Sequence, residues 1–390
     1  MRRPARRPAR PAALPLAVLL VLGLPRTGAR AEDYVDYRYE DYSEEGGRIG
    51  VRTQGLTASD DLGPDTTVGF TVLNDAISGA SPIGIPAPAG SRQVPLANLA
   101  DHRKAWEVDA SRQWRHLNLA VGFAESREHD YVSRGWSVNS RTDFNQKNTE
   151  LTAGLAGHRD QVETFFDPGR EYQGKQAVTA IVGLRQLLDP LTFVTVNASW
   201  GRETGYLDDQ YKLVQKTEEL VPGSFFALPF AENRPGERNL GSLYGAVNRA
   251  FPRVHGAIEA SYRYYADTFG IQAHTVELRW LQKLGRRVTV APDLRLTREG
   301  AADFYSYDLD PTPIVPTQVP NSAGPAYSSD YRLSSFEAVS VGAHLTAQVV
   351  EHVQLNLGYE RYAMRGRDGV TPQSAYPVAN ITTVGARITW

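Results

Sequence analysis

The chain has 390 residues with 34 glycines, 19 tyrosines and no cysteine, and its 42 Lys and Arg nearly balance its 44 Asp and Glu. The lack of cysteine excludes disulfides, Cys-ligated metal sites and a thiol nucleophile. The aromatic and glycine-rich composition favours an all-β chain whose stability comes from packing and backbone pairing.

The N-terminus has the pattern of a secretory signal peptide. The first ten residues hold five arginines and no acid, and an apolar stretch from Leu14 to Leu24 leads to Ala29-Arg30-Ala31. We therefore predict a cleaved signal peptide over residues 1–31. The stretch is shorter than the roughly 20 apolar residues of a membrane helix, and no second one follows, which excludes a helical membrane protein. Removing residues 1–31 leaves 35 basic and 44 acidic residues, a charge of −9 that disfavours nucleic-acid binding.

Residues 32–390 show no linker or composition break, so we predict a single domain. Apolar side chains alternate with small or polar ones along most of it, as in the segment 353–359, where the odd positions are apolar. This alternation predicts β-strands with one apolar and one polar face. Marking each such segment predicts about 16 strands, within a range of 14–18, beginning near Tyr34, Arg48, Thr66, Arg103, Gln113, Asp130, Lys147, Lys175, Leu191, Asn239, Arg253, Ile271, Arg287, Tyr331, His352 and Val378.

The predicted connections alternate in length. Short ones are expected near Arg112, Asn145, Asp189-Pro190, Pro252, Gly285-Arg286 and Glu351, with a slightly longer one at 60–63. Long ones are expected over residues 75–102, 157–174, 203–238 and 300–330. This asymmetry is typical of a transmembrane antiparallel up-and-down β-barrel with short periplasmic turns and long extracellular loops. Closure into a barrel also removes the unpaired sheet edges that hydrocarbon would not tolerate.

The last strand carries the most specific local pattern. A polar residue, Thr383, is followed two positions later by Gly385, and hydrophobic residues occupy the third-last and last positions, Ile388 and Trp390. These four residues are similar to the C-terminal insertion signal of outer-membrane barrels, with Trp390 in the usual aromatic place. We therefore expect this strand to engage the barrel-assembly machinery.

Charged residues recur on the face opposite the apolar side chains, and we expect them to point into the lumen. They are Glu107, Asp109, Arg185, Glu259, Arg263, Glu277, Arg279, Asp293, Arg295 and Glu360. If the turn after residue 284 centres on Arg286, Glu277 lies opposite Arg295 and Arg279 lies opposite Asp293. A turn centred on Gly285 would place Glu277 opposite Asp293, which the repulsion between two acids disfavours. Such a ladder can brace the lumen or form a charged constriction that selects solutes, and the two roles are compatible.

Two long loops contain apolar segments, residues 81–88 and 221–230. Such segments can fold inward as a plug or dock a partner, and inward folding is the simpler expectation.

The run Glu128-His129-Asp130 alternates its side chains across a strand, so we expect a solvated hairpin tip there and not a metal site. The sequence has no Gly-x-Ser-x-Gly, His-Glu-x-x-His, phosphate-binding Gly loop or EF-hand spacing, and we expect no cofactor, no metal and no enzyme activity.

Four blocks together resemble a known family. They are residues 34–42, 75–82, 126–131 and 140–149, of which Asp75-Ala76-Ile77-Ser78-Gly79-Ala80-Ser81-Pro82 is the most distinctive. With these blocks the chain resembles the bacterial family known as domain of unknown function 3570, over essentially its whole length after residue 31. The resemblance implies an exported Gram-negative barrel and no established activity, so it identifies no functional residue.

The sequence thus predicts an outer-membrane barrel of a Gram-negative bacterium, surrounded by outer-membrane lipids and monomeric or assembled as a homo-trimer. Its expected function is a porin-like channel for a small solute, because a barrel of this size can leave an aqueous lumen. The alternative is a non-conducting scaffold or receptor that binds a partner through its long apolar loops. A hydrolase built on the barrel wall is the third hypothesis. The sequence does not identify the solute.

Overall fold

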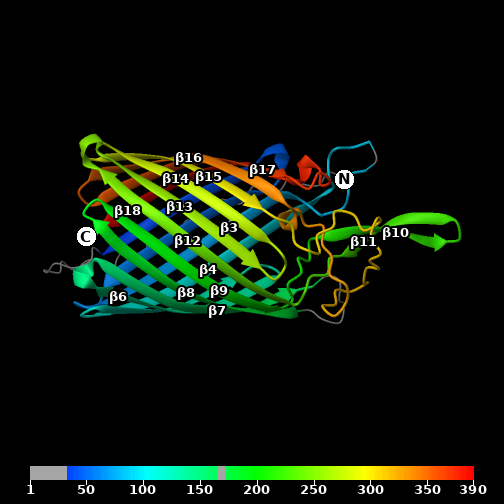
Figure 1. Cartoon of the computed structure of the whole chain (residues 1–390), viewed down its shortest axis with the longest axis horizontal. Coiled ribbons are helices and arrows are strands. Elements are labelled where there is room, and N and C mark those ends of the chain that lie inside the picture. Colours follow the sequence, from blue (N-terminus) through cyan, green and yellow to red (C-terminus); the bar gives the residue numbers. More distant parts are fainter. Residues whose placement is uncertain (1–32, 89, 165–171) are drawn as a thin grey trace, which may run out of the picture.

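The computed structural model describes residues 33–88, 90–164 and 172–390, so the predicted signal peptide lies outside the described residues. Sixteen antiparallel strands form a closed barrel in the order β1-β18-β17-β16-β15-β14-β13-β12-β9-β8-β7-β6-β5-β4-β3-β2 (Figure 1). The predicted fold class and strand number are confirmed.

The barrel strands are β1 (Tyr34–Glu44), β2 (Gly50–Asp61), β3 (Thr66–Pro82), β4 (Leu96–Trp114), β5 (Leu117–Arg127), β6 (Tyr131–Phe144), β7 (Thr149–Glu163), β8 (Tyr172–Asp189), β9 (Thr192–Gly205), β12 (Glu237–Phe251), β13 (Gly256–Asp267), β14 (Gln272–Leu284), β15 (Val288–Glu299), β16 (Phe336–Val350), β17 (Val353–Gly366) and β18 (Val378–Thr389). A separate hairpin consists of β10 (Leu213–Val221) and β11 (Ser224–Ala231). Short 3-10 helices lie in connections at Glu45–Gly47, Asn145–Lys147, Pro252–Val254, Tyr331–Leu333 and Gln373–Ala375.

Closure depends on the pairing of the first and last strands. β1 pairs with β18 from Tyr34 opposite Thr389 to Glu44 opposite Ala379, without a register shift. Each barrel strand therefore has two hydrogen-bonded neighbours, and the sheet has no open edge that would leave backbone groups unpaired in hydrocarbon. Among the described residues, no helix has the length and apolar character required to cross a membrane.

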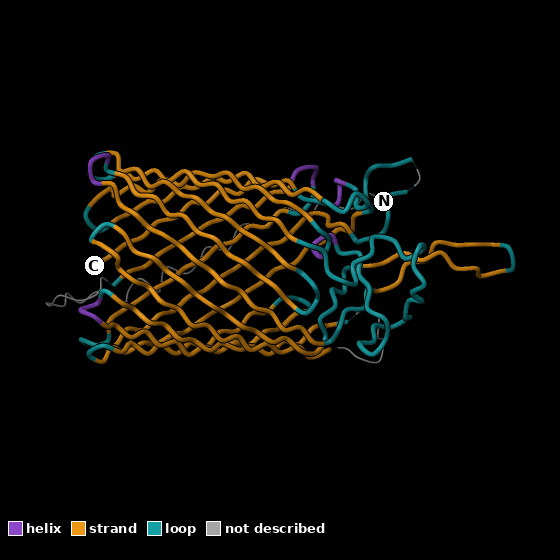
Figure 2. The backbone as a smooth tube through the Cα atoms, viewed as in Figure 1, coloured by secondary structure: helices purple, strands orange, loops and turns teal. Residues whose placement is uncertain are grey.

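The two ends of the barrel differ, as Figure 2 shows. At one end, which we call the turn end, the strands join through short links such as 115–116, 190–191 and 351–352, and Trp390 lies there. At the other, the loop end, the connections include 83–95, 206–236 and 300–335. By the usual topology of outer-membrane barrels, the turn end is periplasmic and the loop end extracellular.

The outer wall is apolar and exposed, the reverse of a soluble protein. Leu119, Val121 and Phe123 alternate along β5, and Leu355, Leu357 and Tyr359 along β17, with every one of these side chains exposed. Neighbouring strands place similar side chains beside them, such as Val138 opposite Val121. The period-two pattern of the sequence therefore reflects a wall with lipid on one side and a polar lumen on the other.

Three loops meet across the opening at the loop end, and we call the described residues of 83–95, 206–236 and 300–335 the loop assembly. Leu213 N–H donates to Ile83 O at 2.7 Å, and Ser329 Oγ donates to Leu213 O at 2.7 Å. These loops are rooted at well-separated positions around the ring of strands, so their contacts can form only if the loops reach across the mouth. Gly84 makes this approach possible, because with φ +95° a Cβ there would lie 2.5 Å from Leu213 O.

The buried apolar clusters also lie at the loop end. Val214, Leu309 and Tyr327 are fully buried within the loop assembly. A second cluster joins Leu207 and Leu333 of the loops to Phe269, in the connection after β13, and a third surrounds Val94 and Tyr376. The loop assembly is thus packed like a small soluble domain.

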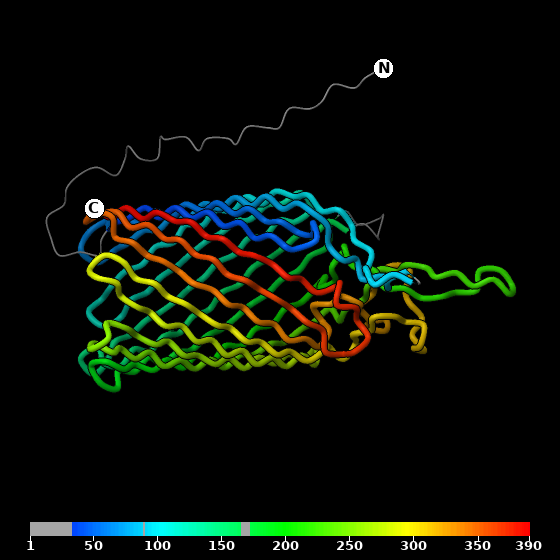
Figure 3. The backbone as a smooth tube through the Cα atoms, turned by 90° about the horizontal axis from the view of Figure 1, so that it is seen from above, coloured from blue at the N-terminus to red at the C-terminus, as the bar shows by residue number. Residues whose placement is uncertain are grey.

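The hairpin β10–β11 corrects one expectation. The segment 221–230 does not fold inward as a plug, because the hairpin tip extends away from the barrel (Figures 1 and 3). Val221 and Phe225 at this tip are 57% and 66% exposed. In the segment 81–88, Ile83 and Ala87 bond to the other loops of the loop assembly, and inward folding of this segment as a plug stays a prediction.

Several predicted boundaries were also wrong. The segment 75–102, expected as a loop, is mostly strand, because β3 continues to Pro82 and β4 begins at Leu96. The turn expected near Arg112 lies at 115–116, and the strand expected from Tyr331 begins at Phe336 after a 3-10 turn. Backbone pairing beyond the membrane does not need alternating side chains, so these strand ends have no period-two pattern.

Candidate functional site

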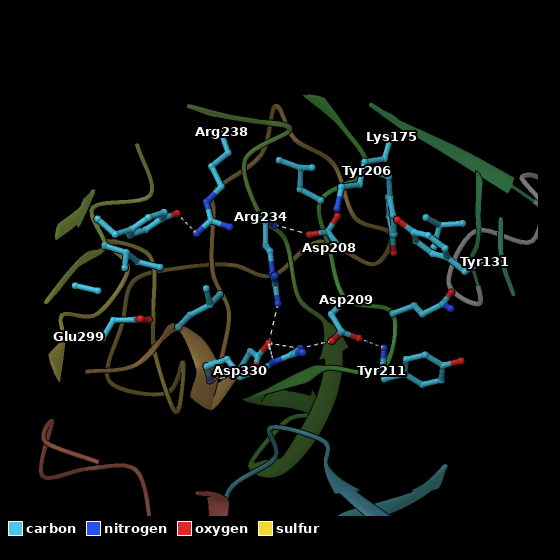
Figure 4. Close-up of a pocket in the computed structure, with 18 of the residues that line it drawn as sticks. Tyr131, Lys175, Tyr206, Asp208, Asp209, Tyr211, Arg234, Arg238, Glu299 and Asp330 are labelled. Carbon is cyan, nitrogen blue, oxygen red and sulfur yellow. Dashed lines mark hydrogen bonds and ion pairs between the residues drawn. The ribbon is translucent and has the colours of Figure 1, made fainter. Parts of the chain in front are cut away.

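A cavity of about 670 Å³ lies where the loop assembly meets the inner wall of the barrel, and we call it the upper chamber. Figure 4 shows side chains from both sources pointing into the same region. Acidic and basic groups line it in nearly equal number, together with tyrosines, and include Tyr131, Lys175, Tyr206, Asp208, Asp209, Tyr211, Arg234, Arg238, Arg263, Glu299, Asp330 and Arg332.

One charge network joins two loops at the floor of the loop assembly (Figure 4). Arg234 Nη2 donates to Glu232 Oε2 at 3.1 Å and to Asp330 Oδ2 at 2.9 Å. Arg332 Nε donates to Asp330 Oδ2 at 2.9 Å, and its Nη2 also bonds Asp209. Glu232 and Asp330 are each only 1% exposed, so these carboxylates depend on the guanidinium groups for compensation. The network therefore holds residues 206–236 against residues 300–335.

Burial and charge act in opposite directions on two carboxyl groups of the upper chamber. Burial raises the pKa of Asp208 to about 6, although the Arg234 N–H donates to its Oδ1 at 2.5 Å. Burial also opposes ionisation of Asp330, but the charges of Arg332, Lys212 and Arg234 together hold the pKa of Asp330 below its usual range. The chamber thus contains a carboxyl that titrates near pH 6 beside one that stays ionised.

Asp130 is not part of a solvated hairpin tip as expected. It is 3% exposed, and its Oδ2 accepts hydrogen bonds from Gln210 Nε2 at 2.6 Å and from Tyr211. Its carboxylate oxygens lie within 4.8 Å of those of Asp101 and Glu128, the one group of described residues with metal-ligand spacing. Gln210 and Tyr211 already donate hydrogen bonds to the Asp130 carboxylate and so take the place that a bound cation would have. The loop assembly covers this hairpin, a contact for which the sequence contains no local pattern.

Four of the sequence-predicted lumen charges meet in a second cavity of about 400 Å³ nearer the turn end, the lower cavity. Arg185, Glu259, Glu277 and Arg279 line it. Arg279 lies 3.6 Å from Glu259 and 3.4 Å from Glu277, and Arg295 Nε lies 3.3 Å from Glu277 Oε2. The strand register places Glu277 opposite Arg295, as the turn centred on Arg286 requires.

The remaining predicted charges lie on the same inner face but not in one cluster. Arg263 lines the upper chamber, and Asp293 lies 3.3 Å from His344. Glu360 accepts a hydrogen bond from Ser340 on the neighbouring strand. Glu107 and Asp109 lie on β4, on the other side of the ring from β14. Among the described residues, the predicted charges are therefore spread over the inner wall and do not gather in one constriction ring.

Sequence reasoning missed the loop residues of the upper chamber. Asp208, Arg234, Asp330 and Arg332 lie outside the barrel strands, so no strand period assigned them a face. One signal was present: Glu232-Asn233-Arg234 and Asp330-Tyr331-Arg332 repeat the same acid-x-arginine spacing in two loops. The spacing alone did not indicate that the two motifs would meet.

The four residues of the expected insertion signal lie on β18 and directly after it. Ile388 and Trp390 are 45% and 40% exposed on the outer face, whereas Thr383 and Gly385 occupy the opposite face. Trp390 N–H donates to Asp33 O at 3.1 Å, which continues the pairing of β18 with the start of the barrel. Its role in assembly stays a prediction.

Comparisons with solved structures identify a fold. A bacterial polysaccharide outer membrane secretin superposes with a TM-score of 0.50 and 10% identity, covering 92% of this chain and 98% of that one. CdiB from Acinetobacter baumannii gives 0.49 and 6%, covering 92% and 60%. The siderophore receptor PirA from Acinetobacter baumannii gives 0.44 and 11%, covering 87% and 54%, so this chain spans about half of that receptor. No curated protein matches by sequence.

The fold is therefore that of an outer-membrane β-barrel, which the secretin shares over nearly its full length. A family model described as "Protein of unknown function (DUF3570)" matches residues 12–376, which is most of the chain. This agrees with the resemblance seen in the four sequence blocks. The chain belongs to the DUF3570 family.

Proposed function

We propose that this protein is a non-catalytic, porin-like channel for small polar solutes, with an extracellular opening narrowed by the loop assembly. The observation that carries the proposal is the charged lining of the lumen and of the loop assembly above it. It runs from the upper chamber, with Arg263 and Asp208, to the lower cavity, with Glu277 and Arg279. A charged lining is stable where water fills the lumen, because each charge facing a dry interior would carry a desolvation cost of several kcal/mol.

The near balance of acidic and basic groups indicates the kind of solute. A lumen lined by one sign of charge selects ions of the other sign, whereas a mixed lining favours polar or zwitterionic molecules. The cavities of about 670 and 400 Å³ have room for molecules of metabolite size. We therefore infer passage of small hydrophilic solutes through the outer membrane, which the protein reaches by export with a cleaved signal peptide.

Planar-bilayer recording of the refolded protein tests the proposal. We expect stepwise conductance, with cation preference lowered by Glu277→Gln and raised by Arg279→Gln, because each change removes one charge from the lower cavity. Glu337→Gln is a matched control, since Glu337 lies on the loop-end outer wall, where Arg367 Nε is 3.0 Å from its carboxylate. Absence of conductance, or an equal shift with the control, would contradict a water-filled lumen.

A second candidate is a receptor role, which one observation favours. The β10–β11 tip presents Leu220, Val221, Phe225 and Phe226 with 48% to 66% of each side chain exposed. Exposed apolar groups of this size commonly contact a partner. Replacing residues 218–226 with a short Gly-Ser turn separates the two candidates. The channel hypothesis predicts unchanged conductance, because the tip lies away from the mouth. The non-conducting receptor hypothesis predicts no conductance before or after the replacement, and loss of surface binding after it.

A further inference from the structure

The outer wall near the loop end carries an uneven distribution of cations. Lys104, Arg127, Arg134 and Arg159 lie on the consecutive strands β4 to β7, and all four are exposed. We call these four residues the basic arc. Their positions alternate with inward-facing residues such as Asp160, so their side chains belong to the outer face.

The register brings like charges directly together within the basic arc. Lys104 is the cross-strand partner of Arg127, and Arg134 is the cross-strand partner of Arg159. Like charges in such positions destabilise a sheet. The one acid among them, Glu125, lies 2.8 Å from both Arg127 and Arg134, so a single carboxylate compensates two guanidinium groups. Lys104 and Arg159 have no ion pair within the described part of the chain, and the arc keeps an excess of three positive charges.

Some exposed arginines of the loop-end wall have an acid beside them, whereas Arg298 and Arg365 flank Glu337, which pairs with Arg367. Arg52 lies 3.3 Å from Asp41, and Arg202 lies 2.9 Å from Glu237. The basic arc differs from these places in that its cations are direct cross-strand partners of one another, which an external anion would compensate.

The depth of the basic arc identifies that anion. Lys104 and Arg134 lie two residues beyond Trp106 and Trp136 on the loop-end side of the same strands, which is about 7 Å along each strand. Exposed tryptophans on a barrel wall mark the boundary between hydrocarbon and headgroups. Cations just beyond this boundary lie at the level of the lipid phosphates of the outer leaflet.

A hollow of about 850 Å³ on this wall offers room for such a headgroup. Arg134 and Arg159 line its charged side, and Phe123 and Trp136 line its apolar side. Guanidinium groups bind phosphate through paired hydrogen bonds, and aromatic rings accommodate acyl or sugar groups beside it. We propose that the basic arc binds the phosphate groups of a phosphorylated glycolipid of the outer leaflet, the chemistry found in lipid A.

Native mass spectrometry of the detergent-solubilised full-length protein tests this site, with diphosphoryl lipid A as the probe. We expect retained lipid A on the wild type and at least a tenfold loss of affinity in Lys104→Gln/Arg159→Gln. Wild-type affinity should also fall when dephosphorylated lipid A replaces the probe and when salt is added, because the contacts are ionic. The matched control, Arg52→Gln/Arg202→Gln, removes two exposed outer arginines and should leave binding unchanged.

Several results would overturn the proposal. They are equal binding of dephosphorylated lipid A, equal loss in the control, and displacement of lipid A by inorganic phosphate or phosphatidylglycerol at matched concentration. Displacement by inorganic phosphate would assign the arc to free phosphate, and displacement by phosphatidylglycerol would assign it to any anionic lipid. Heat-modifiable migration on gels verifies folding, which the test variants should retain because they remove a like-charge conflict. The site is independent of conductance, so its failure leaves the channel proposal unaffected.

Discussion

The barrel wall and the loop assembly are built on opposite rules. On the wall, large apolar side chains such as Leu243 and Val341 are more than half exposed, and the charges face inward. In the loop assembly, Val214 and Tyr327 are fully buried around a paired charge network. The wall is stabilised by backbone pairing and lipid contact, and the loop assembly by packing and ion pairs in water. The two regions should therefore fail under different substitutions.

The largest expected effect is on the loop assembly. Arg234→Met removes the guanidinium between Glu232 and Asp330 and leaves two buried carboxylates undercompensated, which should cost about 3–5 kcal/mol locally. Hydrogen exchange should accelerate in residues 206–236 and 300–335, while the barrel strands stay protected. Equal acceleration in β13 and β14 would show that the two regions are one cooperative unit.

A matched pair on β9 tests the wall. Val196 is 47% exposed on the outer face, and its neighbour Thr195 lines the lower cavity. Val196→Arg should lower the free energy of unfolding by about 2–4 kcal/mol if the site lies near the bilayer midplane, whereas Thr195→Arg should have little effect. Urea titration in lipid vesicles measures both. Similar losses for the two variants would contradict the assignment of the faces.

A smaller effect should follow the protonation of Asp208. Its pKa is raised to about 6, so the folded protein takes up a proton there between pH 7 and 5, where an ordinary Asp would stay ionised. The upper chamber then loses one negative charge, and cation preference in bilayer recordings should fall as the pH drops through about 6. Asp208→Asn should remove this step and resemble the wild type at low pH. A step that persists in this variant would assign the titration to another group.

The wall could be predicted because lipid and water impose a period of two on every spanning strand. Segments such as 353–359 show this period directly, and the ten lumen charges follow from its parity. Strand ends outside the bilayer have no such constraint. Residues 75–82, rich in Gly, Ser and Pro, nevertheless extend β3, because β4 supplies their backbone partners as far as Leu96.

The upper chamber could not be predicted for a related reason. Arg234 and Asp330 are far apart in the sequence, and their contact depends on three loops meeting across the mouth. Asp130 likewise becomes buried only because Gln210 reaches it from another loop. Such contacts follow from tertiary packing and have no local period.

The central claim is a water-filled path from the upper chamber to the lower cavity, and cysteine labelling tests it most directly because the native chain has no cysteine. Thr297→Cys places a thiol in the upper chamber, Thr195→Cys in the lower cavity and Val196→Cys on the lipid face. A small charged thiol reagent added at the extracellular side should label the first two and leave the third unlabelled. Labelling of Thr297→Cys alone, with Thr195→Cys reached only from the periplasmic side, would contradict a continuous channel.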